Sequence, residues 1–159
     1  MERLQHRNIS FVTVHGNDGI MQAAAAAKGD LKILAVTVLT SLDRGDLDDL
    51  GFQCDIEELV LSRARRAIHC GCDGVVASGH EAARLRDELG DRLMIVIPGI
   101  RPVENTDDQK RTVTVQNAFS HGADYIVVGR PIRDADNPRE VAETIQREIA
   151  NTLMSVHPS

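Results

Sequence analysis

The stretch Tyr125-Ile126-Val127-Val128-Gly129-Arg130-Pro131-Ile132 joins a short apolar run to a glycine, an arginine and a proline. A continuous run of β-branched residues is typical of a buried parallel strand, so it predicts a strand over residues 125–128. Gly129 allows backbone N–H groups to approach an anion, Arg130 supplies a planar set of donors, and Pro131 suits the first position of a helical turn. The stretch therefore predicts a phosphate site at the carboxyl end of a strand.

The rest of the chain alternates strand-like and helix-like segments, which is the pattern of a mostly parallel α/β sheet. Short apolar runs predict four further strands, at residues 9–15, 31–39, 74–77 and 93–97. Helical spacing and turn residues predict five helices, at residues 18–28, 56–70, 80–89, 115–121 and 138–154. A length of 159 residues suits a single domain over residues 1–159.

Composition narrows the class of protein. The chain is 42% hydrophobic but has only three Phe, one Tyr and no Trp, which predicts an aliphatic core of the kind found in parallel sheets. A net charge of -6 argues against a general nucleic-acid binder. No stretch approaches the roughly 18 apolar residues of a membrane helix, and residues 1–8 do not resemble a signal peptide. We therefore expect a cytoplasmic protein that binds neither nucleic acid nor membrane.

Two groups of residues raise the question of a metal. His69 stands beside Cys70 and Cys72, but a closed zinc site needs about four ligands with paired spacing, and no second pair exists. We interpret this segment as a helix end that leads into a buried strand, with reduced thiols. The loop after the second strand is rich in aspartate, which fits either a magnesium site or, as we prefer, a solvated surface: Asp43, Asp46, Asp48 and Asp49.

Polar residues follow four of the predicted strands: Thr40 and Ser41, Ser78, Pro98 to Arg101, and Gly129 with Arg130. Parallel strands point the same way, so these groups converge on one edge of the sheet. Any single Ser or Thr here is equally well explained as a loop cap. The long segment 99–112 is either a lid or a solvated loop, and His15 is most simply a histidine at the rim. Neither a P-loop nor a GxGxxG fingerprint is present.

Four segments together resemble the C-terminal part of bacterial orotidine 5'-phosphate decarboxylases. They are Val36-Thr37-Val38-Leu39-Thr40-Ser41, Asp73-Gly74-Val75-Val76, Pro98-Gly99-Ile100-Arg101-Pro102 with Asp108-Gln109, and Gly122-Ala123-Asp124 running on through Ile132. The likeness extends from Ile9 to about Ile149. It implies a (β/α)8 TIM barrel that converts orotidine 5'-monophosphate to UMP in pyrimidine biosynthesis, without metal or organic cofactor.

The resemblance also implies roles for individual residues. Gln109, Gly129 and Arg130 bind the phosphate, and the loop that carries Gln109 closes over it. Arg101 contacts the substrate near the phosphate, Thr40 meets the pyrimidine, and Pro98 forms part of the wall of the base pocket.

One departure from the family is large. The catalytic groups of the family are an Asp after the first strand, a Lys after the second, and an Asp-x-Lys-x-x-Asp array on the third. None of these groups occurs in this sequence. Residues 9–15 match the fourth strand, so only five βα units of a partial barrel are expected, as in a truncated chain. We assign no catalytic residue and predict that the isolated chain is inactive. Five units cannot close a barrel, so bare strands at 9–15 and 125–128 predict a dimer or other pairing through open edges.

Two alternatives remain open from the residues alone. The chain length and the number of βα units favour a five-stranded flavodoxin-like sheet that holds a phosphorylated ligand without catalysis. A phosphosugar lyase or synthase of the same barrel superfamily, generally metal-dependent, would share the phosphate site. The segments 98–102 and 39–41 favour the pyrimidine enzyme.

Overall fold

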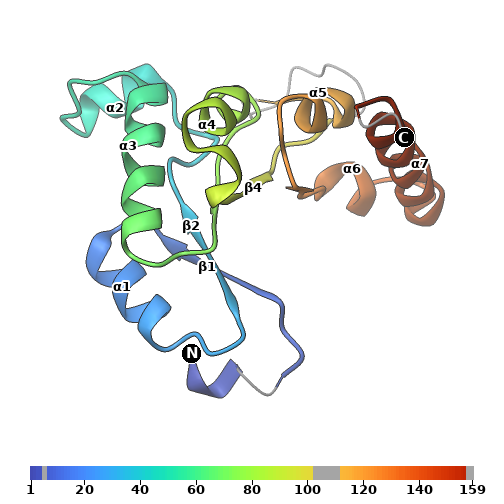
Figure 1. Ribbon diagram of the computed structural model, residues 1–159. Helices are drawn as coiled ribbons and strands as arrows, with labels where there is room; N and C mark the ends of the chain where they lie inside the picture. The colour runs from blue at the N-terminus through green and yellow to red at the C-terminus, as the bar shows by residue number, and fades with distance from the viewer. Residues whose placement is uncertain (5–6, 102–111, 157–159) are drawn as a thin grey trace.

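The computed structural model describes residues 1–4, 7–101 and 112–156, and it contains one parallel sheet (Figure 1). All five predicted strands are present, each within its expected range but shorter. Their bounds are β1 Phe11–His15, β2 Lys32–Val36, β3 Gly74–Val76, β4 Met94–Ile97 and β5 Tyr125–Ile126.

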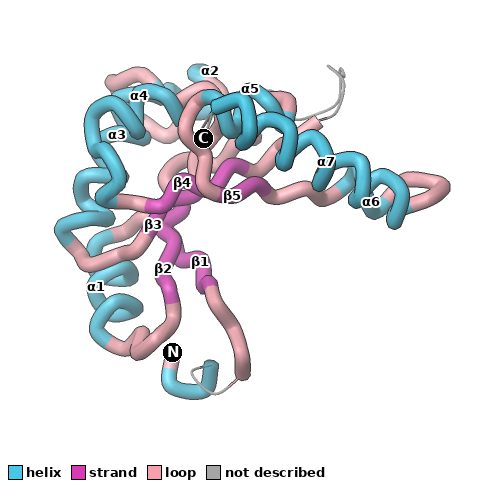
Figure 2. Tube along the Cα trace, turned by 45° about the vertical axis from the view of Figure 1, so that its right-hand side comes forward, coloured by secondary structure: helices cyan, strands magenta, loops and turns pink. Residues whose placement is uncertain are grey.

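The order of the strands decides between the two expected folds. The sheet runs β1-β2-β3-β4-β5, so each strand pairs in parallel with the next one in the chain. A flavodoxin-like sheet has the order 2-1-3-4-5, with helices on both faces. Sequential right-handed crossovers instead place the helices on one face, and Figure 2 shows them along the outer side of a curved sheet. The flavodoxin-like alternative is wrong, and the fold is five βα units of a TIM barrel.

The five predicted helices are present with small changes in their ends. Two short helices lie between them, of which the first was not predicted and the second corresponds to the helical turn expected at Pro131. The five predicted helices are α1 Asp18–Ala26, α3 Ile56–His69, α4 Ala82–Leu89, α5 Val115–Ser120 and α7 Pro138–Val156. The two short helices are α2 Arg44–Asp49 and α6 Arg130–Arg133. In addition, 3-10 turns cover Glu2–Leu4 and Gly90–Arg92. None of the described helices is long and apolar enough to cross a membrane.

Helix α2 replaces the solvated loop expected around the aspartates. The Asp43 carboxylate accepts a hydrogen bond from the Asp46 N–H at 3.0 Å, and the Asp46 carboxylate accepts one from the Asp43 N–H at 2.8 Å. This reciprocal pair is a capping box, which satisfies two backbone donors at the helix start. Asp48 pairs with Arg44 at 2.7 Å. Three of the four aspartates therefore have structural partners.

The core lies between the sheet and the outer helices, and it is aliphatic, as predicted. Side chains of β2, β3 and β4 that point outward are almost fully buried: Ile33, Ala35, Val75, Ile95 and Ile97. They belong to the same cluster as the buried face of α3, including Val60, Ala64 and Ala67. Burial of each Val or Ile side chain among these contributes about 1.5–3 kcal/mol.

β5 differs from the buried strand that its sequence predicts. Tyr125 is 46% exposed and Val127 is 52% exposed, whereas Ile126 and Val128 are half-buried and pack against the core. The alternation shows that β5 buries only its outward face, because it lies at the edge of the sheet and its inward face is open.

The amino ends of the strands are fixed by a polar arrangement that occurs twice. Asp73 accepts from the Ile33 N–H at 2.8 Å and pairs with Lys28 at 2.8 Å. Asp124 accepts from the Ile95 N–H at 2.7 Å and pairs with Arg86 at 2.7 Å. In both cases an aspartate just before one strand binds the preceding strand and a cation, which is Lys28 just after α1 in one case and Arg86 within α4 in the other.

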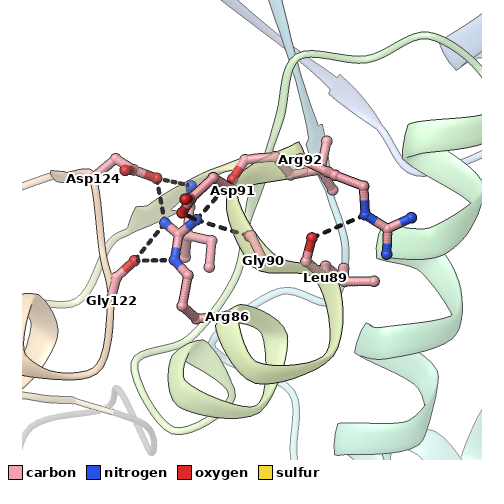
Figure 3. A network of polar contacts seen from close by, with 9 residues as sticks. Arg86, Leu89, Gly90, Asp91, Arg92, Gly122 and Asp124 are labelled. Carbon is pink, nitrogen blue, oxygen red and sulfur yellow. Dashed lines mark hydrogen bonds and ion pairs between the residues drawn. The ribbon is translucent and has the colours of Figure 1, made fainter.

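Each cation also binds a backbone carbonyl two residues before its aspartate. Lys28 donates to the Gly71 carbonyl at 3.0 Å, and Arg86 donates to the Gly122 carbonyl at 2.7 Å, as Figure 3 shows for Arg86. Gly71 and Gly122 have φ of 82° and 92°, a conformation that favours glycine. These contacts hold the edge of the sheet opposite to the candidate site.

Candidate functional site

Four of the six predicted site residues line one cavity at the carboxyl ends of β4 and β5. The cavity has a volume of about 250 Å³ and is lined by Pro98, Gly99, Ile100, Arg101, Val127, Gly129, Arg130 and Arg133. The loop after β4 provides one side and the start of α6 provides the other. The convergence expected from parallel strands is therefore present for these four residues.

Arg101 is held in the wall of this cavity. Its backbone N–H donates to the Val113 carbonyl at 3.0 Å, and the residue is only 7% exposed. Nη1 donates to the Ile100 carbonyl at 3.2 Å, but Nη2 is buried and has no hydrogen-bond partner within the described residues. An unpaired buried donor is costly, so Arg101 is suited to an anionic ligand.

Gly129 and Arg130 form the opposite wall. The Gly129 carbonyl accepts from the N–H groups of Ile132 and Arg133 at 3.1 and 3.0 Å, which fixes the start of α6. A Cβ added at Gly129 would meet no protein atom within 4 Å, so the space in front of this backbone is open. Helix α6 begins at Arg130, which makes Pro131 its second residue instead of its first.

Arg133 also lines the cavity, and sequence analysis did not select it. It lies one helical turn after Arg130, and its guanidinium binds the Asp134 carboxylate at 2.6 and 2.8 Å. These hydrogen bonds hold the pKa of Asp134 below its usual range, and the charges of Arg130 and Arg101 act in the same direction. The spacing of Arg130 and Arg133 on one turn is the signal that could have indicated Arg133.

The cavity is therefore cationic although the chain as a whole is acidic. Three arginines line it, Arg101, Arg130 and Arg133, and all three lower the pKa of Asp134. Guanidinium groups and open backbone are the usual partners of phosphate oxygens. The cavity is therefore a candidate site for an anionic ligand.

The remaining predicted site residues lie elsewhere. Thr40 is half-buried in the turn after β2 and does not line the cavity. Gln109 lies outside the described residues, as does most of the predicted lid. Ser78 is fully buried, and its hydroxyl oxygen accepts a hydrogen bond from the His80 N–H at 3.2 Å, which is the loop-capping contact that its sequence context allowed.

The other sequence candidates are structural or peripheral. Cys70 and Cys72 are buried free thiols at the end of α3, as predicted, and His15 ends β1 with an exposed side chain. In the part of the chain that the structure describes, no group of three His, Cys, Asp or Glu side chains is placed to hold a metal ion.

A second cavity of about 180 Å³ adjoins Arg101 from the side of α5. Its lining includes His80, Asn117 and His121, which sequence analysis did not select. Arg101 lines both cavities.

Comparison with known proteins agrees with this geometry. Residues 1–145 match the family described as orotidine 5'-phosphate decarboxylase / HUMPS family. The chain belongs to this family.

Relatives in the family are similar over nearly the whole chain. The orotidine 5'-phosphate decarboxylase of Methylococcus capsulatus is 67% identical over 155 residues, which are 96% of this chain and 64% of that protein. The enzyme of the same name from Nitrobacter winogradskyi is 55% identical over 148 residues, covering 91% of this chain and 62% of that protein. The chain thus spans slightly less than two thirds of the length of these relatives.

Solved structures support the fold. The orotidine 5'-phosphate decarboxylase of Lactobacillus acidophilus matches with a TM-score of 0.75 and 35% identity, over 89% of this chain and 63% of that chain. The enzyme from Pyrococcus horikoshii matches with a TM-score of 0.63 and 30% identity, over 90% of this chain and 62% of that chain. The five βα units therefore have the arrangement found in the family.

Proposed function

We propose that this chain forms the phosphate- and pyrimidine-binding part of an orotidine 5'-monophosphate decarboxylase, which produces UMP in pyrimidine biosynthesis. The observation that carries the proposal is the cavity between Arg101 and the Gly129–Arg130 turn, in a chain whose family relatives have that name. Its cationic lining suits the 5'-phosphate of a nucleotide.

The phosphate is remote from the carbon that loses carbon dioxide. In this proposal Gly129, Arg130 and Gln109 hold the phosphate, and Arg101 contacts the substrate beside it. Binding energy from this remote group lowers the barrier only if it is used in the transition state, for example by aligning the pyrimidine. We also propose, from the family resemblance, that closure of the loop that carries Gln109 excludes water and sets the pace of product release.

The pyrimidine extends from the phosphate across the carboxyl edge of the sheet. Pro98 lines the cavity. In this proposal it also forms part of the wall of the base pocket, and Thr40, in the turn after β2, meets the ring. The lysine that protonates the product carbon belongs to the Asp-x-Lys-x-x-Asp array, which the 159 residues do not contain. We therefore propose that this chain alone binds nucleotide without a cofactor and does not turn it over.

Ligand-induced thermal shifts of the purified chain test the proposal. UMP and 6-azauridine monophosphate should raise the melting temperature more than inorganic phosphate or uridine at equal concentration. Stabilisation by phosphate alone would instead indicate a simple phosphate module, and stabilisation only by a sugar phosphate with a divalent metal would indicate a phosphosugar lyase. Turnover of orotidine 5'-monophosphate by the chain alone would contradict the assignment of its catalytic groups.

We further propose that the open edges of β1 and β5 pair with another chain. Exposed Tyr125 and Val127 beside an unpaired strand edge favour association, as a homodimer or as a swapped assembly. Sedimentation velocity over a range of concentrations should show a dimer or larger species, and a monomer at all concentrations would contradict this. The free cysteines suit a cytoplasmic location.

A further inference from the structure

Arg63 of α3 makes contacts that differ from those of the neighbouring arginines. Its Nη1 donates a hydrogen bond to the Thr37 carbonyl, just after the end of β2. Its guanidinium carbon lies 5.7 Å from the centre of the Phe52 ring. A cationic donor bound to a neutral carbonyl and placed over an aromatic ring has a defined position.

The other arginines of α3, and Arg84 of the neighbouring helix α4, bind carboxylates. Arg65 pairs with Glu88, Arg66 with Asp18, and Arg84 with Glu57. Within the described residues, Arg63 has no such ion pair. Its charge is therefore directed at the backbone of the β2 end instead of at the protein surface.

Thr37 is the point where this contact meets the sheet. The residue is 1% exposed, and both its N–H and its hydroxyl donate to the Val76 carbonyl, at 3.1 and 2.9 Å. These bonds fix Thr37 against β3 just beyond the last paired residue of β2. The bond from Arg63 satisfies the carbonyl, which leaves Thr37 anchored from both sides.

The anchored residue leads directly into the turn that carries Thr40. The Leu42 N–H donates to the Leu39 carbonyl at 3.0 Å, so Thr40 and Ser41 occupy the two central positions of this turn. A turn of this kind moves with the residues before it. The direction in which Thr40 faces therefore depends on the Thr37 anchor.

Helix α2 contributes to the same anchor through Phe52. The Phe52 N–H donates to the Leu47 carbonyl at 2.9 Å, and Gly51 has a φ of 81°, so the chain reverses after α2 and places the ring beside Arg63.

From these contacts we infer that Arg63 is a positioning residue that sets the turn of Thr40 and thereby the recognition of the pyrimidine base. The inference rests on the proposed function, because it assumes that Thr40 meets the base. It assigns Arg63 no contact with the phosphate, which binds at the ends of β4 and β5. Loss of Arg63 should therefore affect affinity for a nucleotide and leave affinity for phosphate intact.

Titration calorimetry with two probes, UMP and inorganic phosphate, tests this inference. Arg63→Met keeps the apolar stem but removes the donors, and it should weaken UMP binding by about tenfold or more while phosphate binding changes less than about twofold. Arg63→Lys keeps one donor and should restore part of the UMP affinity. Arg65→Met, on the same helix, is the control and should change neither affinity.

Hydrogen exchange provides a readout without ligand. In Arg63→Met the Leu42 amide should exchange faster than in the wild type, whereas the core amide of Val75 should not change. If Arg63→Met does not fold, Phe52→Leu removes the ring, leaves the hydrogen bond possible, and should show the same selective loss of UMP affinity to a smaller extent.

Different outcomes separate the two proposals. Equal losses for UMP and phosphate, or no loss for UMP, in folded Arg63→Met would overturn the role of Arg63 while wild-type binding of UMP still supports the proposed function. Wild-type protein that binds UMP no better than phosphate would overturn the proposed function, and the inference about Arg63 with it.

Discussion

Phe11 in β1 and Tyr125 in β5 meet edge to face with ring centroids 5.1 Å apart, although their strands are at opposite ends of the sheet. From Tyr125, one paired residue on each of β4, β3 and β2 leads across the sheet to His15 on β1. His15 lies four residues after Phe11, so the contact is offset by four residues from this row of pairs. In a barrel of eight strands with a shear of eight, the strand register shifts by about four residues over half the circumference. The contact therefore shows that five strands keep the curvature and tilt of the whole barrel.

If this contact stabilises the curved sheet, Phe11 and Tyr125 should be energetically coupled. A double-mutant cycle with Phe11→Leu and Tyr125→Leu should give a coupling of about 0.5–1.5 kcal/mol in the free energy of unfolding, measured with urea. Phe52→Leu combined with Tyr125→Leu is the control and should be additive. Additivity of the Phe11 and Tyr125 substitutions as well would argue against a stabilising contact.

Arg130→Ala should reduce the affinity for UMP by at least about tenfold. Removal of a hydrogen bond to a charged group costs about 1.5–3 kcal/mol, and about 1.4 kcal/mol corresponds to a factor of ten. Arg139→Ala is a suitable control, because Arg139 is exposed on α7 and pairs with Glu143. An unchanged dissociation constant for UMP in Arg130→Ala would remove Arg130 from the site.

Asp73 should make the fold sensitive to acid. Burial raises the pKa of Asp73, but the hydrogen bonds from Lys28 and the Ile33 N–H and the charges of Lys28 and Lys32 together bring it below its usual value. A lowered pKa in the folded state stabilises the protein above the unfolded-state pKa of about 3.9, and this stability is lost as the pH falls through the folded-state value.

Urea unfolding at pH 7, 5, 4 and 3 measures this effect. The wild type should lose stability below about pH 4, and Asp73→Asn should be less stable at pH 7 and lose less on acidification. Asp87→Asn, on α4, is the control for a general effect of lost charge. Identical pH profiles for the wild type and Asp73→Asn would show that Asp73 does not contribute.

Cys72 should react slowly with alkylating agents. Burial raises the pKa of the Cys72 thiol to about 11, so little thiolate is present at neutral pH, and the side chain is nearly inaccessible. Mass spectrometry after brief treatment with iodoacetamide at pH 7.5 should find half-buried Cys54 modified and Cys72 unmodified. In urea both should react, and early modification of Cys72 in the native protein would contradict its burial.

Sequence patterns located the strands because apolar runs and their spacing report burial directly. They could not locate α2, which depends on the exchange of hydrogen bonds between Asp43 and Asp46 more than on an apolar face. They also overestimated the burial of Tyr125 and Val127, because a run of apolar residues does not say whether a strand is central or at an edge.

The gathering of candidate residues at one edge of the sheet was predicted because strand direction alone decides it, whereas their roles in binding stay predictions. Parallel strands bring Arg101 and the Gly129–Arg130 turn to one edge, and the structure places them around one cavity. Arg133 was missed because the expected helical turn at Pro131 was not extended to residues 130–133, so the three-residue spacing of Arg130 and Arg133 was not used. The role of Thr40 came from family resemblance, since nothing in its local sequence distinguishes a ligand contact from a turn residue.

A crystal structure of the chain with UMP tests the central claim most directly. The account predicts the 5'-phosphate in the cavity between Arg101 and α6, with phosphate oxygens about 2.7–3.0 Å from the Arg130 guanidinium and the Gly129 N–H. UMP bound with its phosphate at any other surface, or a cavity that stays empty at a saturating UMP concentration, would contradict it.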